Sequence, residues 1–145
     1  MKISYSKKLK HLRVIKQAVK VALLDHDYCG LVSLDFCVMP KKHRHIMGGN
    51  TLVKKDKGKI NIAPDMSKFE TALIVAHEMV HISQYATGKI VDNENWTTWN
   101  GWLTLPDWLF NVTVFGKLEY NPFYWLNPWE REARAYEKKI REAIE

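Results

Sequence analysis

The stretch from Ala72 to Ile82 places two histidines and a glutamate at a spacing that suits metal chemistry. His77, Glu78 and His81 form the pattern His-Glu-x-x-His inside an apolar run that predicts a helix. Residues four apart lie on one face of a helix, so both imidazoles can reach a single metal ion. Glu78 is rotated by about 100° from His77 and can reach a water on that metal without binding the metal itself. We therefore expect a zinc site with His77 and His81 as ligands and Glu78 as general base.

The alternative is that two core histidines and a helical glutamate bind nothing. The surrounding sequence favours a metal. Ser67 and Glu70 have the spacing of a capping box, and Gly88 predicts the end of the helix. Because the helix is apolar on nearly all sides, we expect it to be buried. Buried His and Glu side chains are costly without a partner, and a metal would supply one.

A catalytic zinc usually has three protein ligands and one open position for water. In one extended form of the motif, His-Glu-x-x-His-x-x-Gly-x-x-His, the last histidine is the third ligand. Here Gln84 and Thr87 occupy the glycine and histidine positions, which excludes that form. The other carboxylates that follow the helix are the candidates: Asp92, Glu94, Glu119, Glu130 and Glu132. Only Glu130 and Glu132 lie in a segment with a convincing helical pattern.

The elements around the motif predict an α+β fold in one domain spanning residues 1–145. An amphipathic N-terminal helix is expected over residues 6–26, and a half-buried strand over 31–39. Two more strands, at 46–54 and 59–63, are separated by a turn for which Asp56 and Gly58 are suitable residues. Gly48, Gly49 and Asn50 predict a bulge or a twist in the first of them. Three sequential strands predict a short three-stranded antiparallel sheet, with helices packed on one face.

The second half of the chain predicts an aromatic-rich loop segment and a last helix. The segment after Gly88 is dense in aromatic residues and contains Pro, Gly and Asn, which argues against a long helix. A short helix is expected near 105–111, and the aromatic side chains are expected to form a second small core. Residues 128–144 predict the C-terminal helix, with Asn127 as its N-cap. Glu130 and Glu132 flank its apolar stripe on opposite sides, so either could face the buried helix.

The composition limits the classes of protein that remain. Apolar residues make up 46% and charged residues 26%, as in a soluble globular protein. No apolar run approaches the roughly 18 residues of a membrane span, and no signal peptide is evident, so we expect a cytoplasmic protein without membrane contact. Cys29 and Cys37 are expected to be free thiols. The net charge of +6 is concentrated at residues 7–10, 41–45 and 54–57. It favours acidic partners such as nucleic acid, although a solvated surface that keeps the protein soluble is the preferred explanation.

The motif and its later context resemble a known family. The sequence His-Glu-Met-Val-His at 77–81, Gln-Tyr at 84–85 and Pro-Trp-Glu-Arg-Glu-Ala at 128–133 is similar to the minimal gluzincin metallopeptidases. It resembles in particular the small SprT-like peptidase proteins that bacteriophages often carry. The resemblance implies a zincin-like metallopeptidase domain, a Zn²⁺ cofactor and a protein or peptide substrate. For a phage-encoded protein it implies the host cytoplasm.

The resemblance also bears on the third ligand. In the family the ligand helix often reads Glu-x-x-Ala followed by Asp or Asn, which places the ligand on Glu130, with Ala133 matching. Arg134 departs from this pattern, because a guanidinium cannot accept the hydrogen bond that Asp or Asn takes from a ligand histidine. Glu132 therefore stays open as an alternative ligand.

The expected function is zinc-dependent hydrolysis of peptide bonds. Zinc held by His77, His81 and Glu130 would lower the pKa of its water to about 7, and Glu78 would take the proton. By family analogy, the strand at 59–63 would offer its edge to an extended peptide. Two alternatives remain: a nucleic-acid-associated protein that uses its basic clusters, and a non-catalytic zinc-binding module that binds another protein.

Overall fold

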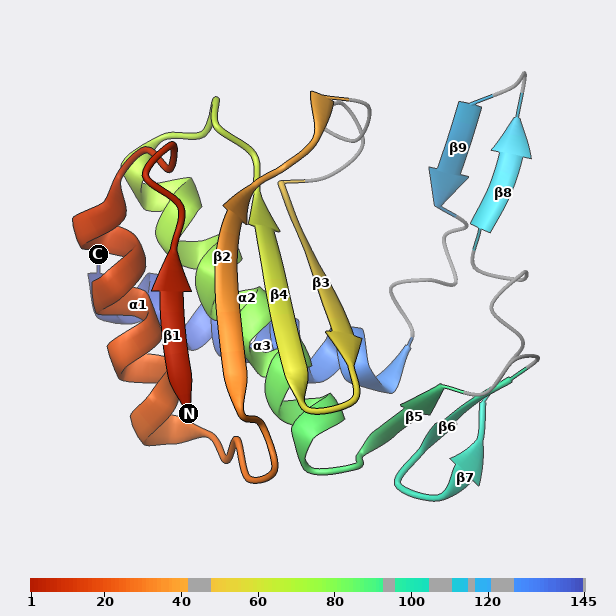
Figure 1. Ribbon diagram of the computed structural model, residues 1–145. Helices are drawn as coiled ribbons and strands as arrows, with labels where there is room; N and C mark the ends of the chain where they lie inside the picture. The colour runs from red at the N-terminus through yellow and green to blue at the C-terminus, as the bar shows by residue number, and fades with distance from the viewer. Residues whose placement is uncertain (42–47, 93–95, 105–110, 115–116, 121–126, 145) are drawn as a thin grey trace.

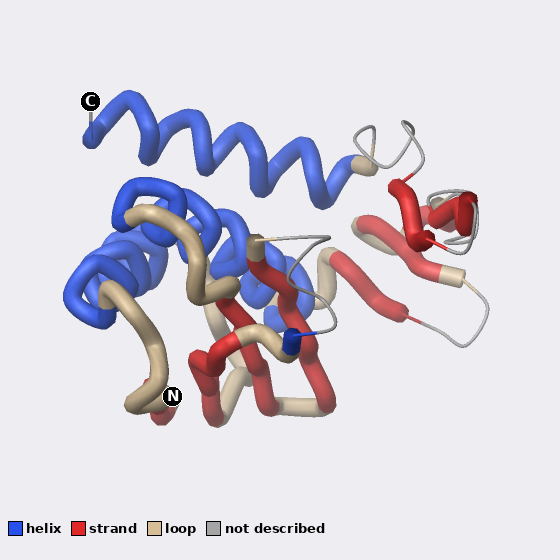
Figure 2. The backbone as a smooth tube through the Cα atoms, turned by 90° about the horizontal axis from the view of Figure 1, so that it is seen from above, coloured by secondary structure: helices blue, strands red, loops and turns tan. Residues whose placement is uncertain are grey.

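The computed structural model describes residues 1–41, 48–92, 96–104, 111–114, 117–120 and 127–144. The described residues form an α+β fold, as expected, with helices covering one face of a four-stranded sheet (Figure 1). The elements in chain order are β1 (Lys2–Tyr5), α1 (Leu12–Asp25), β2 (Ser33–Val38), β3 (Gly49–Lys54), β4 (Lys57–Ile62), α2 (Lys68–Ala86), β5 (Ile90–Asp92), β6 (Thr97–Trp99), β7 (Trp102–Leu103), β8 (Asn111–Val114), β9 (Lys117–Tyr120) and α3 (Pro128–Ile144). Seen from above, α3 lies farthest from the sheet, beyond the layer of the other helices (Figure 2).

The main sheet is mixed, so the expected three-stranded antiparallel sheet was wrong. Its order is β1-β2-β4-β3, with β1 and β2 parallel, β2 and β4 parallel, and β3 and β4 antiparallel. β1 and β2 can be parallel because α1 carries the chain back between them. β4 lies inside the sheet because Ile60 and Ile62 are both buried there, whereas β3 exposes Leu52 and Lys54 and forms the edge.

The first helix is shorter than the sequence predicted. It begins at Leu12 rather than near residue 6, because the chain before it forms β1 and a turn. Tyr5 of β1 stacks on Phe36 of β2, with ring centroids 5.1 Å apart, and so ties this strand to the core. His11, just before the helix, has a φ of 56°, which marks the change of direction. The helix ends at Asp25, and β2 begins at Ser33.

α2 matches its prediction closely. The hydroxyl oxygen of Ser67 accepts from the backbone N–H of Glu70 at 3.2 Å, and the Glu70 carboxylate accepts from the backbone N–H of Ser67 at 2.8 Å. This is the expected capping box. The helix ends at Ala86, and Gly88 follows it with a φ of 72°. Nearly all sides of α2 are buried, because it packs against the sheet, α1 and α3.

Two glycines let the sheet approach α2 closely, and neither has the role that the sequence predicted. The β3–β4 turn is made by Lys55 and Asp56, while Gly58 lies within β4. A Cβ on Gly58 would lie 2.8 Å from Cδ1 of Ile82. Gly49 pairs in register with Ile62 at the start of β3 and does not form a bulge. A Cβ on Gly49 would lie 2.5 Å from Cγ2 of Ile74.

The aromatic-rich segment contains short strands where the sequence predicted loops. β5, β6 and β7 form a three-stranded antiparallel sheet, and β8 pairs with β9. Trp99 packs against Trp129 of α3 at 6.3 Å between ring centroids, but Trp102 is 79% exposed. The expected second core is therefore incomplete among the described side chains. The helix expected near 105–111 falls on residues outside the described part, except Asn111, which begins β8.

Two smaller expectations concern the cysteines and the membrane. Cys29 and Cys37 are both free thiols, as expected. Within the described ranges, each helix is too short or too polar to cross a bilayer.

Candidate metal centre

The two motif histidines lie on the face of α2 that meets α3. α3 begins at Pro128, and the backbone N–H of Arg131 donates to the carbonyl of Asn127 at 2.9 Å. Ala133 and Tyr136 are buried on the core-facing side of α3. Glu130 precedes Ala133 by one turn, so it lies on the same face and points toward α2. Glu130 is only 3% exposed.

The ligand atoms of His77, His81 and Glu130 converge within 4.8 Å of one another. Nε2 of His77 and Nε2 of His81 are 3.1 Å apart. One Glu130 oxygen is 3.3 Å from Nε2 of His77, and the other is 3.1 Å from Nε2 of His81. Zinc bonds of about 2.0–2.1 Å in a tetrahedron separate neighbouring ligand atoms by roughly 3.3–3.4 Å. The two imidazole nitrogens are therefore separated by nearly the distance that one tetrahedral zinc ion requires, and Glu130 presents a different oxygen to each of them.

The charges of these groups are coupled. Burial by itself lowers the pKa of His77, but the contacts with Glu130 and Glu137 outweigh it and raise the pKa to about 9. Burial raises the pKa of Glu130, but the close contacts with His77 and His81 hold that pKa well below its usual range. In the metal-free protein near neutral pH, the raised pKa favours a protonated His77 paired with the Glu130 carboxylate. A buried carboxylate with this demand for positive charge suits a divalent metal.

Glu132, the alternative ligand, lies elsewhere. Its carboxylate accepts from Nζ of Lys89 at 2.6 Å and from Nε2 of Gln84 at 3.0 Å. Of the remaining candidates, Asp92 is also apart from the cluster. Asp92 accepts from the hydroxyls of Tyr85 and Thr97, Glu119 lies in β9, and Glu94 is outside the described residues. The structure therefore brings Glu130, and not Glu132, to the two imidazoles.

Glu78 is buried against the edge strand β3. The Thr51 hydroxyl lies 2.7 Å from Oε2 of Glu78 and 3.2 Å from its backbone carbonyl oxygen. An atom added as Cβ at Gly49, two residues before Thr51 on the same strand, would lie 3.1 Å from Oε1 and from Cγ of Glu78. Glu78 is close enough to His77 for its charge to raise the pKa of the imidazole. The carboxylate is thus held beside the cluster without being one of its three convergent groups.

Two partners of the histidines were not assigned from the sequence. Nδ1 of His81 lies 2.8 Å from Oε1 of Gln84. Nδ1 of His77 lies 3.4 Å from Oε2 of Glu137, although without the alignment of a hydrogen bond. The family pattern expects an acceptor at position 134, one turn after Glu130, where this chain has Arg134. The carboxylate beside Nδ1 of His77 is instead that of Glu137, two turns after Glu130 and on the same helical face.

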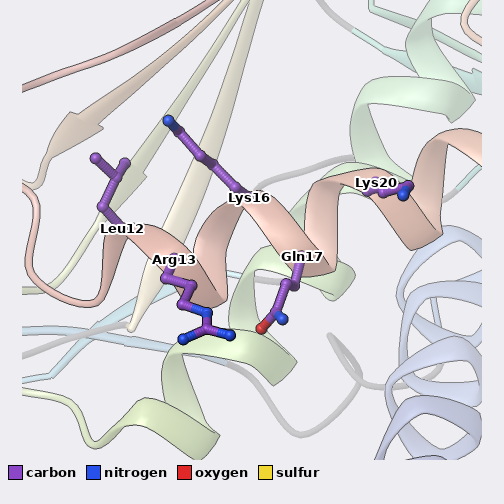
Figure 3. A pocket seen from close by; sticks show the side chains of 5 residues that line it. All are labelled: Leu12, Arg13, Lys16, Gln17 and Lys20. Carbon is purple, nitrogen blue, oxygen red and sulfur yellow. The ribbon is translucent and has the colours of Figure 1, made fainter.

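A separate feature is a shallow hollow on the outer side of α1, with a volume of about 510 Å³. It is lined by Leu12, Arg13, Lys16, Gln17 and Lys20, which project from one helix (Figure 3). None of these residues belongs to the His77, His81 and Glu130 cluster. The hollow is therefore a basic surface feature and not the mouth of the metal centre.

Comparisons of the chain with protein-family models, curated proteins and solved structures found no significant match. The function of this centre must therefore be inferred from its own geometry.

Proposed function

We propose that the chain is a zinc metallopeptidase of the gluzincin type. The observation that carries this proposal is the convergence of His77, His81 and Glu130 within 4.8 Å. Two imidazoles and one carboxylate form a donor set typical of catalytic zinc, since a fourth position is left for water or substrate. When bound, zinc would polarise that water and the scissile carbonyl.

Glu78 is the proposed general base. Its carboxylate lies beside the cluster, and the Thr51 hydroxyl binds one of its oxygens at 2.7 Å. This contact fixes the rotamer of the side chain and leaves Oε1 to exchange a proton with water. Glu78 can take a proton from the attacking water and return it to the leaving amine. A purely structural zinc site would have no need of such a base.

An extended peptide is the proposed substrate, and β3 is the strand that would bind it. The expectation from the sequence named residues 59–63, but these belong to β4, which is paired on both sides and has no open edge. β3 has a neighbour on one side only among the described strands. It also carries Gly49 and Thr51, which contact Glu78. A peptide added to β3 would therefore lie next to the proposed base.

The decisive experiment compares the wild type with Glu78→Gln. Elemental analysis should find about one zinc per chain in both proteins, because Glu78 is not a ligand. Hydrolysis of unfolded casein or of a peptide library should fall at least about a hundredfold in Glu78→Gln, the usual scale for a lost general base.

The control is Glu142→Gln, which removes an exposed carboxylate that pairs only loosely with Lys138, at 3.9 Å. It should leave both zinc content and hydrolysis unchanged. Failure of the wild type to bind zinc, even when zinc is added, would refute the metal centre. Equal hydrolysis by zinc-loaded wild type and Glu78→Gln would refute the mechanism.

A second candidate function is nucleic-acid binding, and one observation favours it. Arg13, Lys16 and Lys20 are exposed and line the same hollow on α1. Cations on one helical face can follow a phosphate backbone, and such binding weakens steeply with salt. Replacing the three residues with Gln should then lower affinity for DNA or RNA and flatten the salt dependence. Binding that is equal in the triple variant would exclude this surface.

A further inference from the structure

The orientation of the Gln84 side chain is determined by its surroundings. Gln84 is 1% exposed, and its Nε2 lies 3.0 Å from the Trp129 carbonyl oxygen and 3.0 Å from Oε2 of Glu132. Both neighbours can only accept hydrogen bonds, because a carbonyl and an ionised carboxylate have no proton to donate. The amide nitrogen must therefore face them, and the amide oxygen must face His81.

This orientation determines which nitrogen of His81 carries a proton. Oε1 of Gln84 lies 2.8 Å from Nδ1 of His81 and can only accept. Nδ1 must then be the donor. In the neutral imidazole the other nitrogen, Nε2, is left with a free lone pair. Nε2 is the atom that faces His77 and Glu130.

Glu132 is held in turn by Lys89. Nζ of Lys89 donates to Oε1 of Glu132 at 2.6 Å, while Oε2 of the same carboxylate accepts from Gln84. The chain Lys89–Glu132–Gln84–His81 joins the start of the small sheet, α3 and α2. Only Glu132 is distant from the other three in sequence, and each contact has one donor and one acceptor.

We propose that Gln84 is a positioning residue that holds His81 in the Nδ1-protonated form, and that Glu132 and the Trp129 carbonyl fix the Gln84 amide in the orientation this requires. The expectation that Gln84 strengthens zinc binding rests on the proposed function, but the protonation of Nδ1 of His81 does not. A neutral amide does this without adding a further carboxylate to those of Glu78, Glu130 and Glu137 around the cluster.

The first test uses the wild-type protein alone. Long-range ¹H–¹⁵N correlation spectra of ¹⁵N-labelled protein at mildly alkaline pH distinguish protonated from unprotonated ring nitrogens. Nδ1 of His81 should be protonated both in the metal-free protein and with one equivalent of Zn²⁺. An unprotonated Nδ1 in either sample would overturn the proposal. The metal-free spectrum alone shows whether Nδ1 of His81 is protonated. A failure to bind zinc would therefore refute the proposed function without affecting the test of this proposal.

The second test uses variants. Gln84→Met keeps a similar length but has no amide oxygen, and it should lower zinc affinity about 10–100-fold in a chelator competition. The same spectra should show that Nδ1 of His81 is no longer held in one protonation state. Glu142→Gln, which removes a carboxylate from the exposed side of α3, should change neither result. Wild-type zinc affinity in a folded Gln84→Met protein would overturn the positioning role.

Discussion

Gly49→Ala should destabilise the protein through one contact that can be identified. An ideal Cβ at this position lies 2.5 Å from Cγ2 of Ile74, whereas two carbons in contact prefer about 3.5–4.0 Å. The overlap is therefore about 1 Å or more. Neither atom is the end of a flexible side chain, so β3 and α2 must separate. Overpacking of this kind costs about 1–3 kcal/mol, which in a chain of this length lowers Tm by roughly 3–4 °C per kcal/mol.

A double-mutant cycle isolates the contact. Ile74→Ala removes Cγ2 and should relieve the overlap, so Gly49→Ala should cost at least about 1 kcal/mol less in that background. Ile74→Val removes only Cδ1 and keeps Cγ2, so it should give no relief. Gly88→Ala provides a second control. Gly88 has a φ of 72° and nothing within 4 Å of an added Cβ, so its cost comes from backbone strain and should not depend on Ile74.

Urea unfolding should be measured by circular dichroism on metal-free protein in excess chelator, so that changes in zinc affinity do not enter the free energy of unfolding. We predict that Ile74→Ala reduces the stability cost of Gly49→Ala and that Ile74→Val does not. Equal costs of Gly49→Ala in all three backgrounds would show that the close approach of β3 to α2 is not what requires glycine.

Three further outcomes follow from the centre itself. Glu130→Gln should reduce zinc affinity far more than Glu132→Gln, because only Glu130 faces both imidazoles; a reversed ranking by chelator competition would reassign the ligand. Zinc affinity should rise with pH by up to about tenfold per pH unit below pH 9. The reason is that His77, whose pKa is raised to about 9, must lose its proton before it binds metal. A zinc affinity that does not change with pH would contradict this. Thr51→Val should lower peptide hydrolysis roughly tenfold while zinc affinity stays unchanged, since the hydroxyl that holds Glu78 is lost. Thr51→Ser keeps the hydroxyl and should retain activity. If Thr51→Val hydrolyses peptides as fast as the wild type, Thr51 does not position Glu78.

The local features of α2 could be predicted because their signals are local. The capping box at Ser67 and Glu70, the apolar run and the glycine after the helix all lie within one segment. The shared face of His77 and His81 follows from helical geometry alone. The choice between Glu130 and Glu132 could not be made in this way, because it depends on how α3 is rotated against α2.

The order of the strands could not be predicted because it depends on long-range pairing. β1 is only four residues long, and its alternation of polar and apolar side chains is too brief to stand out. Gly58 was misinterpreted because a glycine that allows close packing looks the same in sequence as one that makes a turn. The roles of Thr51 and Glu137 depend on neighbours that only the fold brings together.

The distance in sequence between the two halves of the centre has a consequence for biosynthesis. Glu130 follows His81 by 130 − 81 = 49 residues. At synthesis rates of about 5–20 residues per second, the carboxylate leaves the ribosome roughly 2–10 s after the histidines. The sheet and α2 can begin to fold in that interval, but the three convergent groups cannot meet until α3 docks. A nascent protease with this arrangement would be unable to digest its own growing chain or its neighbours before its fold is complete.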